Sequence, residues 1–504
     1  MTEGSSYRQI LRSSSIIGGA SVINILVGLV RMKVAAVLLG PAGVGLIGLF
    51  TNIVVTGAGV AGLGVGTVGT RQIAEAAGQD DPRRIWLVRR ALFWLTLGLA
   101  LVGGLVFWLL RGVLAERVLE DPSLAGALGW LSIAVALGVA AASQTALLNG
   151  MRRIGDLARL SVWSAVLSTL AAVAALWWWG RGGILAYVLA APVANFILGH
   201  WYVSRLPSVA LAKARWPDMS GQWRTMLHLG FAFMVAALAG TVGQLAVRAL
   251  VQRELGADAL GHFHAAWAIS MTYIGFVLGA MATDYYPRLT AVINDPAAVN
   301  RLVNEQTEVA LLLAAPVLLA MLALAPWVIR LLYSAEFLEA VDVLRWQVLG
   351  DILKIASWPL GFILLASGAG KTYVGTEWLA MGLFFALTFL LLPVMGIAAT
   401  GASVLGMYGI YLVLLWALAV RRTGFAWTGE VKRHAVLIFA SGMAIHVLAW
   451  VSEWAAAGVG TLLAAWWGVF ALVRLAHASG LGGPVGKMAG VARAILVKGG
   501  IWRG

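Results

Sequence analysis

The sequence predicts an all-α protein that crosses a membrane about fourteen times, with both ends on the cytoplasmic side. Three observations predict this fold class. Hydrophobic residues make up 61% of the 504 positions and charged residues only 12%, about half the charged share of a soluble chain. The apolar residues are gathered into stretches long enough to cross a bilayer. Short clusters of Lys and Arg lie between these stretches, as in the loops of a multi-pass protein.

A helix needs about 20 residues to cross ~30 Å of hydrocarbon at 1.5 Å per residue, so each apolar stretch of that length is a candidate span. Several stretches are longer, and we expect them to tilt or to extend beyond the bilayer. For the last two predicted spans, the alternative is one re-entrant pair of helices that does not cross the membrane. In chain order, the predicted spans are residues 10–39, 42–70, 85–110, 124–150, 157–179, 183–204, 225–252, 259–287, 302–333, 337–368, 372–392, 397–420, 434–451 and 456–476.

The cationic residues give the orientation of these spans. With the N-terminus inside, 26 Lys and Arg fall in cytoplasmic segments, 5 in outer segments and 5 within spans. Cytoplasmic loops carry an excess of basic residues, and one missed span would reverse every later loop, so this asymmetry supports the topology. The short polar N-terminus has no small-residue cleavage site, so we expect the first stretch to be a span and not a removed signal.

The chain also contains a weak internal repeat. Its offset places the first span over the seventh in the same direction, so we expect two lobes related by a pseudo-twofold axis along the membrane normal. One constant offset pairs Leu39, Gly40, Gly45, Gly59 and Thr67 with Leu255, Gly256, Gly261, Gly275 and Thr283. Just before these positions, Val30-Arg31 matches Val247-Arg248 at an offset that is longer by a single position.

This repeat predicts the domain organisation. We expect a six-helix lobe at residues 1–205 and a second at residues 225–421, joined by a cytoplasmic linker at residues 206–224. Residues 434–476 would add two transmembrane helices, and residues 477–504 a basic, glycine-rich cytoplasmic tail that lies on anionic lipid headgroups.

Ionised side chains within spans predict the functional site, because each costs at least ~2.5–3.5 kcal/mol to insert at mid-bilayer and usually faces a cavity or a partner. Arg31 and Arg248 are the first candidates, since neither has an acidic residue one turn away. A guanidinium pairs bidentately with phosphate oxygens, so these residues predict an anionic, phosphorylated substrate. Lys33 and Lys354 would add to the positive field. Snorkelling toward the interface is the alternative for the two arginines.

Other polar and aromatic residues within spans have secondary expectations. Candidates for coupling or for lining the cavity are Asp351, Arg345 and Asp284. Asp351 lies three residues before Lys354 on a helix, so mutual neutralisation is the alternative. Candidates for stacking on sugars, with packing as the alternative, are Trp267, Tyr273 and Trp346.

Several motifs that suggest cofactors are better explained otherwise. Residues 64–69 match a dinucleotide fingerprint literally, but they lie within an apolar span without the required strand. We therefore expect Gly62, Gly64 and Gly66 to serve helix packing or bending. His262 and His264 lack further ligands at zinc spacing and are expected to form hydrogen bonds, with proton sensing as the alternative. No metal, cofactor or nucleic acid is expected.

Two segments carry a resemblance to a known family. Leu39-Gly-Pro-Ala-Gly-Val-Gly45 and the glycine-rich span after it resemble the first hairpin of Wzx-type polysaccharide flippases, in the multidrug/oligosaccharidyl-lipid/polysaccharide exporter superfamily. Trp346-Gln-Val-Leu-Gly-Asp351-Ile-Leu-Lys354-Ile, continuing to Gly361-Phe362, is similar to the corresponding span of O-antigen and lipid III flippases. The likeness covers about residues 10–420.

This resemblance implies a function. It implies two six-helix lobes that move an undecaprenyl-pyrophosphate-linked oligosaccharide from the inner to the outer leaflet of a bacterial inner membrane by alternating access. It also implies a cationic central cavity, onto which Arg31 and Arg248 map, and a transporter rather than an enzyme. Membrane lipids, a polysaccharide polymerase and a chain-length regulator are the further partners it suggests. The two extra C-terminal spans depart from the twelve-span members and resemble lipid II flippases in number.

Three other functions stay open from the sequence. A multidrug or cation antiporter of the same fold would need acidic residues in the cavity, and the first six spans carry none well inside the bilayer. A lipid II flippase would share the span count. A membrane glycosyltransferase or polymerase would need catalytic residues on sizeable outer loops, whereas the predicted outer loops are short.

Overall fold

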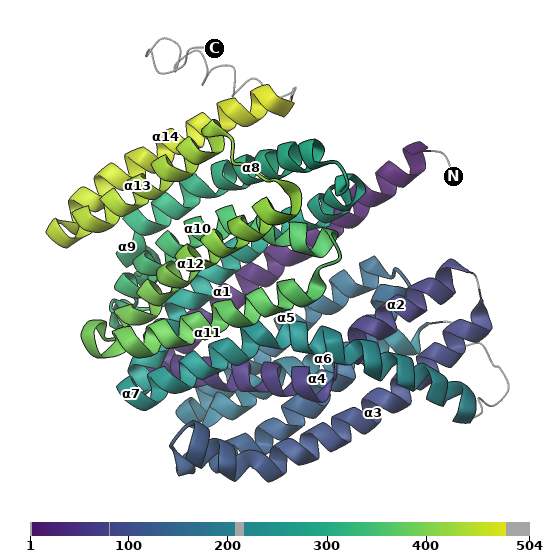
Figure 1. Ribbon diagram of the computed structural model, residues 1–504. Helices are drawn as coiled ribbons and strands as arrows, with labels where there is room; N and C mark the ends of the chain where they lie inside the picture. Colours follow the sequence, from purple (N-terminus) through teal and green to yellow (C-terminus); the bar gives the residue numbers. More distant parts are fainter. Residues whose placement is uncertain (1–2, 80, 207–215, 480–504) are drawn as a thin grey trace. The chain divides into compact units, whose positions relative to one another are not determined.

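The computed structural model describes residues 3–79, 81–206 and 216–479, without the side chains of residues 3–17, 216–218, 276, 280, 282–284 and 476–479. The regular structure of these residues is helical (Figure 1). The α-helices are α1 (Glu3–Ala61), α2 (Val65–Gly78), α3 (Pro82–Val113), α4 (Ala125–Gly150), α5 (Ile154–Trp179), α6 (Ile184–Ser204), α7 (Trp216–Val292), α8 (Pro296–Ala323), α9 (Ala325–Leu332), α10 (Ala340–Ala366), α11 (Gly370–Met395), α12 (Ala398–Thr423), α13 (Gly429–Val451) and α14 (Glu453–Ser479).

Eleven helical segments among the described residues are long and apolar enough to cross a membrane. Three of them, Gly18–Ala61, Ile154–Ser204 and Met219–Gly279, contain 44, 51 and 61 residues, at least twice the length that one crossing needs. Each of the three covers two predicted spans, so the eleven segments accommodate the predicted fourteen. The prediction of an all-helical, multi-pass membrane protein is confirmed. The last two predicted spans are separate helices of 23 and 27 residues, α13 and α14.

Two of the long helices change direction at glycines that the repeat relates. The bend in α1 lies at Gly40, with φ 65° and ψ −170°, and the bend in α7 lies at Gly256, with φ 85° and ψ −177°. Residues with a Cβ rarely adopt such positive φ, so both positions favour glycine. Because the repeat pairs Gly40 with Gly256, it encodes the same backbone turn twice.

The segments that follow these two turns contact each other at backbone distance. A Cβ built on Gly45 would lie 2.6 Å from the carbonyl oxygen of Ala257, and one built on Gly261 would lie 2.0 Å from that of Pro41. Under the offset that pairs the two bends, Pro41 corresponds to Ala257 and Gly45 to Gly261. Each contact is therefore the repeat-related mate of the other, and glycine permits the close approach in both.

The third and ninth predicted spans also begin alike. The carboxylate of Asp81 accepts hydrogen bonds from two backbone amides in the first turn of α3, and Asp295 does the same for α8. A proline follows each aspartate at the start of the helix, where its missing N–H is not needed. Such a cap stabilises a helix by about 1 kcal/mol.

The second predicted span, residues 42–70, is not one continuous helix. The helix α1 ends at Ala61, and α2 begins at Val65 after a turn. Gly64 in this turn has φ 64°, and a Cβ built on it would lie 2.2 Å from the carbonyl oxygen of Gly230. Glycines at Gly62 and Gly64 thus end the helix where the backbone of α7 passes close by, which the apolar composition alone did not reveal.

The helices form two compact units. Unit 1 comprises Met1–His264 and Leu332–Glu336, and unit 2 comprises Ala265–Leu331 and Phe337–Gly504. In unit 1, α3 packs on α4, α5 on α6 and α1 on α5. In unit 2, α10 and α11 pack on α12, and α8 packs on α14. The predicted lobe boundaries stay a prediction.

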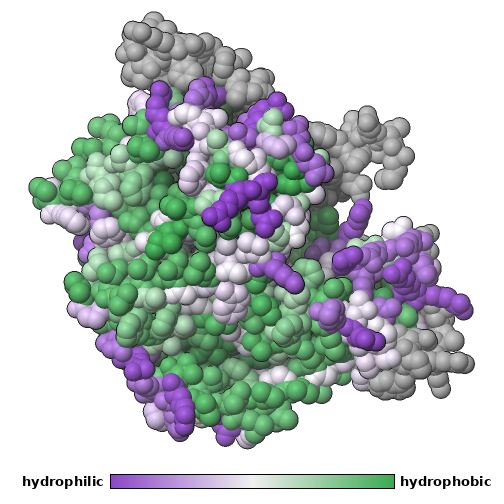
Figure 2. Space-filling view, in the orientation of Figure 1, coloured by the Kyte–Doolittle hydropathy of each residue, from purple (hydrophilic) through white to green (hydrophobic). Residues whose placement is uncertain are grey.

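Apolar side chains cover the outer surfaces of the helices. Figure 2 shows hydrophobic residues over most of the visible helical surface, whereas hydrophilic residues gather near helix ends. At the end of α5, the side chains of Trp177, Trp178 and Trp179 are 73%, 74% and 65% exposed. Exposed tryptophans at a helix end are typical of a membrane–water interface.

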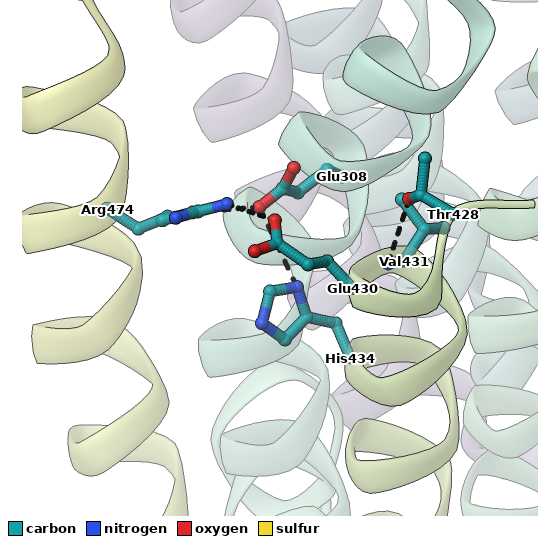
Figure 3. A network of polar contacts seen from close by, with 6 residues as sticks. All are labelled: Glu308, Thr428, Glu430, Val431, His434 and Arg474. Atoms are coloured by element: carbon teal, nitrogen blue, oxygen red, sulfur yellow. Dashed lines mark hydrogen bonds and ion pairs between the residues drawn. The ribbon is translucent and has the colours of Figure 1, made fainter. Parts of the chain in front are cut away.

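The two C-terminal helices are attached to unit 2 by ion pairs at each end of α14. Near its C-terminal end, Arg474 donates a hydrogen bond to Glu308 of α8 at 3.0 Å and pairs with Glu430 of α13 (Figure 3). Nδ1 of His434 lies 3.7 Å from the Glu308 carboxylate. Polar side chains of α8, α13 and α14 therefore contact one another near the C-terminal end of α14.

The other end of α14 is held by a buried arginine of α10. The Arg345 side chain is 2% exposed, and its two Nη atoms donate to the Glu453 carboxylate at 2.8 Å and 2.5 Å. Its Nε donates to the carbonyl oxygen of Leu322 at 3.2 Å. A bidentate pair of this kind fixes geometry as well as charge.

Replacing Gly261 with Ala is expected to lower the thermal stability, because the added methyl group would lie 2.0 Å from the Pro41 carbonyl oxygen. Overpacking of this kind costs about 1–3 kcal/mol. Thermal unfolding of the purified protein in detergent measures the effect. Gly275→Ala in the same helix is the matched control, because its Cβ position has no described neighbour within 4 Å beyond the local helix backbone. A Gly261→Ala protein as stable as the control would contradict the contact.

Replacing Glu453 with Ala is expected to destabilise the attachment of α14, since the buried Arg345 guanidinium would lose its carboxylate. We expect a loss of about 1–3 kcal/mol, visible as a lower melting temperature in detergent. Glu116→Ala, which removes an exposed carboxylate, should leave the melting temperature unchanged. Adding Arg345→Met to Glu453→Ala should recover part of the loss, because no unpaired charge then stays buried. A double variant less stable than Glu453→Ala would argue against this ion pair.

Candidate functional site

A cavity of about 600 Å³ lies within unit 1, with walls from α1, α4, α6 and α7. Most of the wall consists of glycine, alanine, valine and other apolar residues. None of its described lining residues is acidic, whereas one is a permanent cation. The polar lining residues are Arg31, Thr51, Thr145, Tyr187, Asn195 and His264.

Arg31 of α1 is held in this wall by Tyr187 of α6. Its Nη2 donates a hydrogen bond to the carbonyl oxygen of Tyr187 at 2.8 Å, and its Cζ lies 4.1 Å from the centre of the same residue's ring. A cation over an aromatic face is attracted by the ring quadrupole. The Nε–H group of Arg31 is buried without a partner, and no described carboxylate forms an ion pair with the guanidinium. Arg31 is therefore oriented without being neutralised.

Arg248 of α7 reaches the same cavity indirectly. Its side chain is 3% exposed and is not part of the cavity wall. Its Nη1 lies 3.1 Å from Nδ1 of His264, which does line the cavity. Its Cζ also lies 5.3 Å from the centre of the Phe263 ring. The structure thus brings the two predicted arginines to one cavity, Arg31 directly and Arg248 through an imidazole.

Three buried nitrogen atoms at this site have no hydrogen-bond partner. They are Nε of Arg31, Nε of Arg248 and Nε2 of His264. Burying a donor without an acceptor costs about 1–3 kcal/mol, so such groups usually mark a site completed by a ligand or by water. A ligand that satisfies donors must supply acceptor oxygens, and a phosphate group supplies several.

Lys354 and Asp351 both lie in unit 2, where Lys354 lines a second and smaller cavity. Asp351 is fully buried, and its Oδ2 accepts a hydrogen bond from Ser270 while its Oδ1 has no partner. Nζ of Lys354 lies 3.4 Å from Sδ of Met271. This cavity of about 210 Å³ also contains a carboxylate in its wall, that of Glu377, whose Oε1 accepts from Tyr411 at 2.5 Å. The titratable residues lining it are Lys354, Glu377, Tyr373, Tyr408 and Tyr411.

The remaining predicted charged residues do not line the unit 1 cavity. The ammonium group of Lys33 donates to the carbonyl oxygen of Tyr333, which belongs to unit 1. Arg345 forms an ion pair with Glu453 of α14, and a coupling role for it stays a prediction. Asp284 lies in α7, and its side chain falls outside the described residues.

The three rings predicted to stack on sugars pack against protein groups. The ring of Trp267 stacks on that of Phe384 at 5.7 Å, with an angle of 20° between the planes. The hydroxyl of Tyr273 donates to a backbone carbonyl of α8 at 3.3 Å. The ring of Trp346 meets that of His446 edge-on at 4.4 Å. None of the three lines the unit 1 cavity, so a sugar contact by them stays a prediction.

The sequence alone did not point to several of these partners. Tyr187 is 156 residues from Arg31, and Glu453 is 108 residues from Arg345, so no local pattern joins them. Glu377 is different, because it is a carboxylate within the predicted span 372–392. Its position in an apolar stretch was a readable signal of a polar site.

Comparisons with known proteins place the chain in a family. The family described as "Polysaccharide biosynthesis protein" matches residues 34–342. The lipid III flippase of Escherichia coli (strain K12) is 22% identical over 399 residues, which cover 78% of this chain and 94% of that protein. The lipid III flippase of Shigella flexneri has the same identity and coverage.

Solved structures show that the fold is shared with known transporters. An inward-facing multidrug resistance MATE family transporter of the MOP superfamily covers 83% of this chain and 99% of its own, with a TM-score of 0.66 and 13% identity. The lipid II flippase MurJ in an inward closed conformation covers 90% of this chain and 98% of its own, with a TM-score of 0.64 and 13% identity. The predicted resemblance is confirmed: this multi-pass membrane protein belongs to the polysaccharide biosynthesis protein family and has the fold of MOP-superfamily transporters.

Proposed function

We propose that the protein is a flippase that moves an undecaprenyl-pyrophosphate-linked oligosaccharide from the inner to the outer leaflet of a bacterial inner membrane by alternating access. The observation that carries the proposal is the unit 1 cavity, which has an oriented, unneutralised Arg31 and no acidic lining residue among those described. An anionic headgroup is the ligand that such a wall favours. The family and the distant relation to lipid III flippases support the same substrate class.

The apolar part of the cavity fits a lipid-linked substrate better than a free nucleotide or sugar phosphate. Most of its wall is aliphatic, and the glycines and alanines at Gly28, Ala58, Gly138 and Ala142 leave room along α1 and α4. In this proposal the pyrophosphate lies near Arg31, the sugars occupy the aqueous space and the polyprenyl chain stays in lipid. Binding must remain modest, because a headgroup held too tightly would not be released.

Arg248 and Lys33 keep supporting roles in this proposal, whereas the role predicted for Lys354 stays a prediction. Arg248 adds a positive charge next to His264. Lys33 adds to the positive electrostatic potential of unit 1. A polysaccharide polymerase and a chain-length regulator would act on the product in the outer leaflet. Nothing in the proposal requires the chain to make or break a covalent bond.

A cation antiporter is the second candidate, because unit 2 carries carboxylates within its spans. Asp351 and Glu377 both lie in apolar helices of this unit. However, Glu377 shares its small cavity with Lys354, and the larger unit 1 cavity has a cation and no described carboxylate. Drug efflux in a hypersensitive host, present in the wild type and lost with Glu377→Gln, would favour this candidate over a flippase.

Replacing Arg31 with Ala is expected to lower lipid-linked oligosaccharide flipping in reconstituted vesicles at least about tenfold, since one charge-assisted hydrogen bond contributes about 1.5–3 kcal/mol. Arg31→Lys should recover only part of the rate, because an ammonium cannot form the bidentate pair. Arg111→Ala is the matched control, since Arg111 also donates to a backbone carbonyl and stacks on a ring, that of Trp108, but lies outside the cavity. Unchanged flipping by Arg31→Ala would refute the role of this residue.

Tyr187 offers a test of how Arg31 is positioned. The hydrogen bond and the cation–π contact of Arg31 use the carbonyl oxygen and the ring of Tyr187, and a phenylalanine would keep both groups. Tyr187→Phe should therefore keep both flipping and thermal stability, whereas Tyr187→Leu should lose about 0.5–2 kcal/mol of cation–π attraction and flip more slowly. Equal flipping rates for the Phe and Leu variants would show that the ring does not orient Arg31.

A further inference from the structure

The hydrogen bond between Arg248 and His264 fixes the chemistry of the imidazole. Nη1 of Arg248 lies 3.1 Å from Nδ1 of His264. A guanidinium has only donors, so Nδ1 must be the acceptor and must carry no proton. A neutral imidazole has one proton, which then resides on Nε2. A doubly protonated ring would lose this hydrogen bond and would place two cations side by side.

The remaining nitrogen of His264 is therefore a donor that lacks an acceptor. Nε2 is buried and has no hydrogen-bond partner. His264 lines the same cavity as Arg31, and none of the described lining residues is acidic. Because His264 lines the cavity, a ligand oxygen that reaches Nε2 would satisfy this donor.

A second residue controls where the imidazole lies. A Cβ built on Gly48 of α1 would lie 2.4 Å from Nδ1 of His264 and 2.6 Å from Cγ. The offset that pairs Gly45 with Gly261 also pairs Gly48 with His264, so these corresponding positions of the repeat touch each other. The absence of a side chain at Gly48 leaves the space that the ring fills. The His264 ring thus packs against the backbone at Gly48 and is hydrogen-bonded to Arg248.

We infer that His264 is a direct substrate ligand that donates a hydrogen bond from Nε2 to a phosphate oxygen, and that Arg248 acts as a positioning residue through it. This inference rests on the proposed function and deepens it. Arg31 supplies the charge at the cavity wall, and His264 supplies a neutral, directional donor. The ligand class is a pyrophosphate ester, whose several oxygens can accept from both side chains at once.

Binding of farnesyl pyrophosphate and of farnesol to the purified protein in detergent tests the inference. Asn and Gln substitutions separate the two nitrogens of the ring, because the Asn amide matches Nδ1 in reach and the Gln amide matches Nε2. His264→Asn keeps an acceptor for Arg248 and loses the donor, so its affinity for farnesyl pyrophosphate should fall about tenfold. His264→Gln keeps the donor, so its affinity should stay within about threefold of the wild type. Farnesol binding should be unchanged in both variants.

The outcomes separate this inference from the proposed function. If the wild type does not prefer farnesyl pyrophosphate to farnesol, both are overturned. If the preference is lost in Arg31→Ala but kept in full by His264→Asn, the inference for His264 is overturned and the proposed function stands. Nitrogen-15 NMR of labelled histidine gives a readout that needs no ligand, with the His264 signal identified by its loss in His264→Gln. A neutral ring protonated at Nε2 supports the inference, and a proton at Nδ1 overturns it.

Discussion

The backbone contact between residues 41–45 and residues 257–261 is the constraint on which the rest of unit 1 depends. It forms twice, at Gly45 and at Gly261, because each half of the repeat supplies one glycine and one backbone carbonyl. Glycine permits helices to approach at backbone distance in lipid, where apolar burial offers little drive for association. Three residues further along each segment, the same approach brings Gly48 against His264. The packing that joins the two helices thereby also places the imidazole on the cavity wall.

Charge pairing separates the structural cations of this membrane protein from those at the cavity. Arg345 and Arg474 each contact a carboxylate and hold α14 on unit 2. Arg31 and Arg248 have no such partner among the described residues and are oriented by a ring, a carbonyl and an imidazole. A charge in a low-dielectric interior interacts strongly with whatever ion approaches it. Under the proposed function, Arg31 and Arg248 are therefore the cations that attract the anionic headgroup.

Much of the fold was predictable because lipid imposes simple requirements on sequence. Span length and charge placement gave the helical, multi-pass architecture. The internal repeat paired Gly40 with Gly256, but only the structure shows that both helices bend at these positions. Pairing between distant segments was not predictable, because the carbonyl of Tyr187 and the ring of His264 become partners of arginines only after the helices pack. Packing or bending was expected at Gly62, Gly64 and Gly66, but not the end of a helix at Ala61. An apolar, glycine-rich stretch predicts one span, and the close backbone of Gly230 is not visible in the sequence.

The unpaired guanidinium groups of unit 1 have an electrical consequence. Under the proposed function, the vacant site carries about two positive charges, and a pyrophosphate diester with about two negative charges cancels them. The substrate-loaded step then moves little net charge, whereas the return of the empty site moves positive charge through the field. A membrane potential acts on that charge with ~2.3 kcal/mol per elementary charge per 100 mV. Under the proposed function, an inside-negative membrane potential would therefore favour the return of the unloaded protein to its inward-facing form.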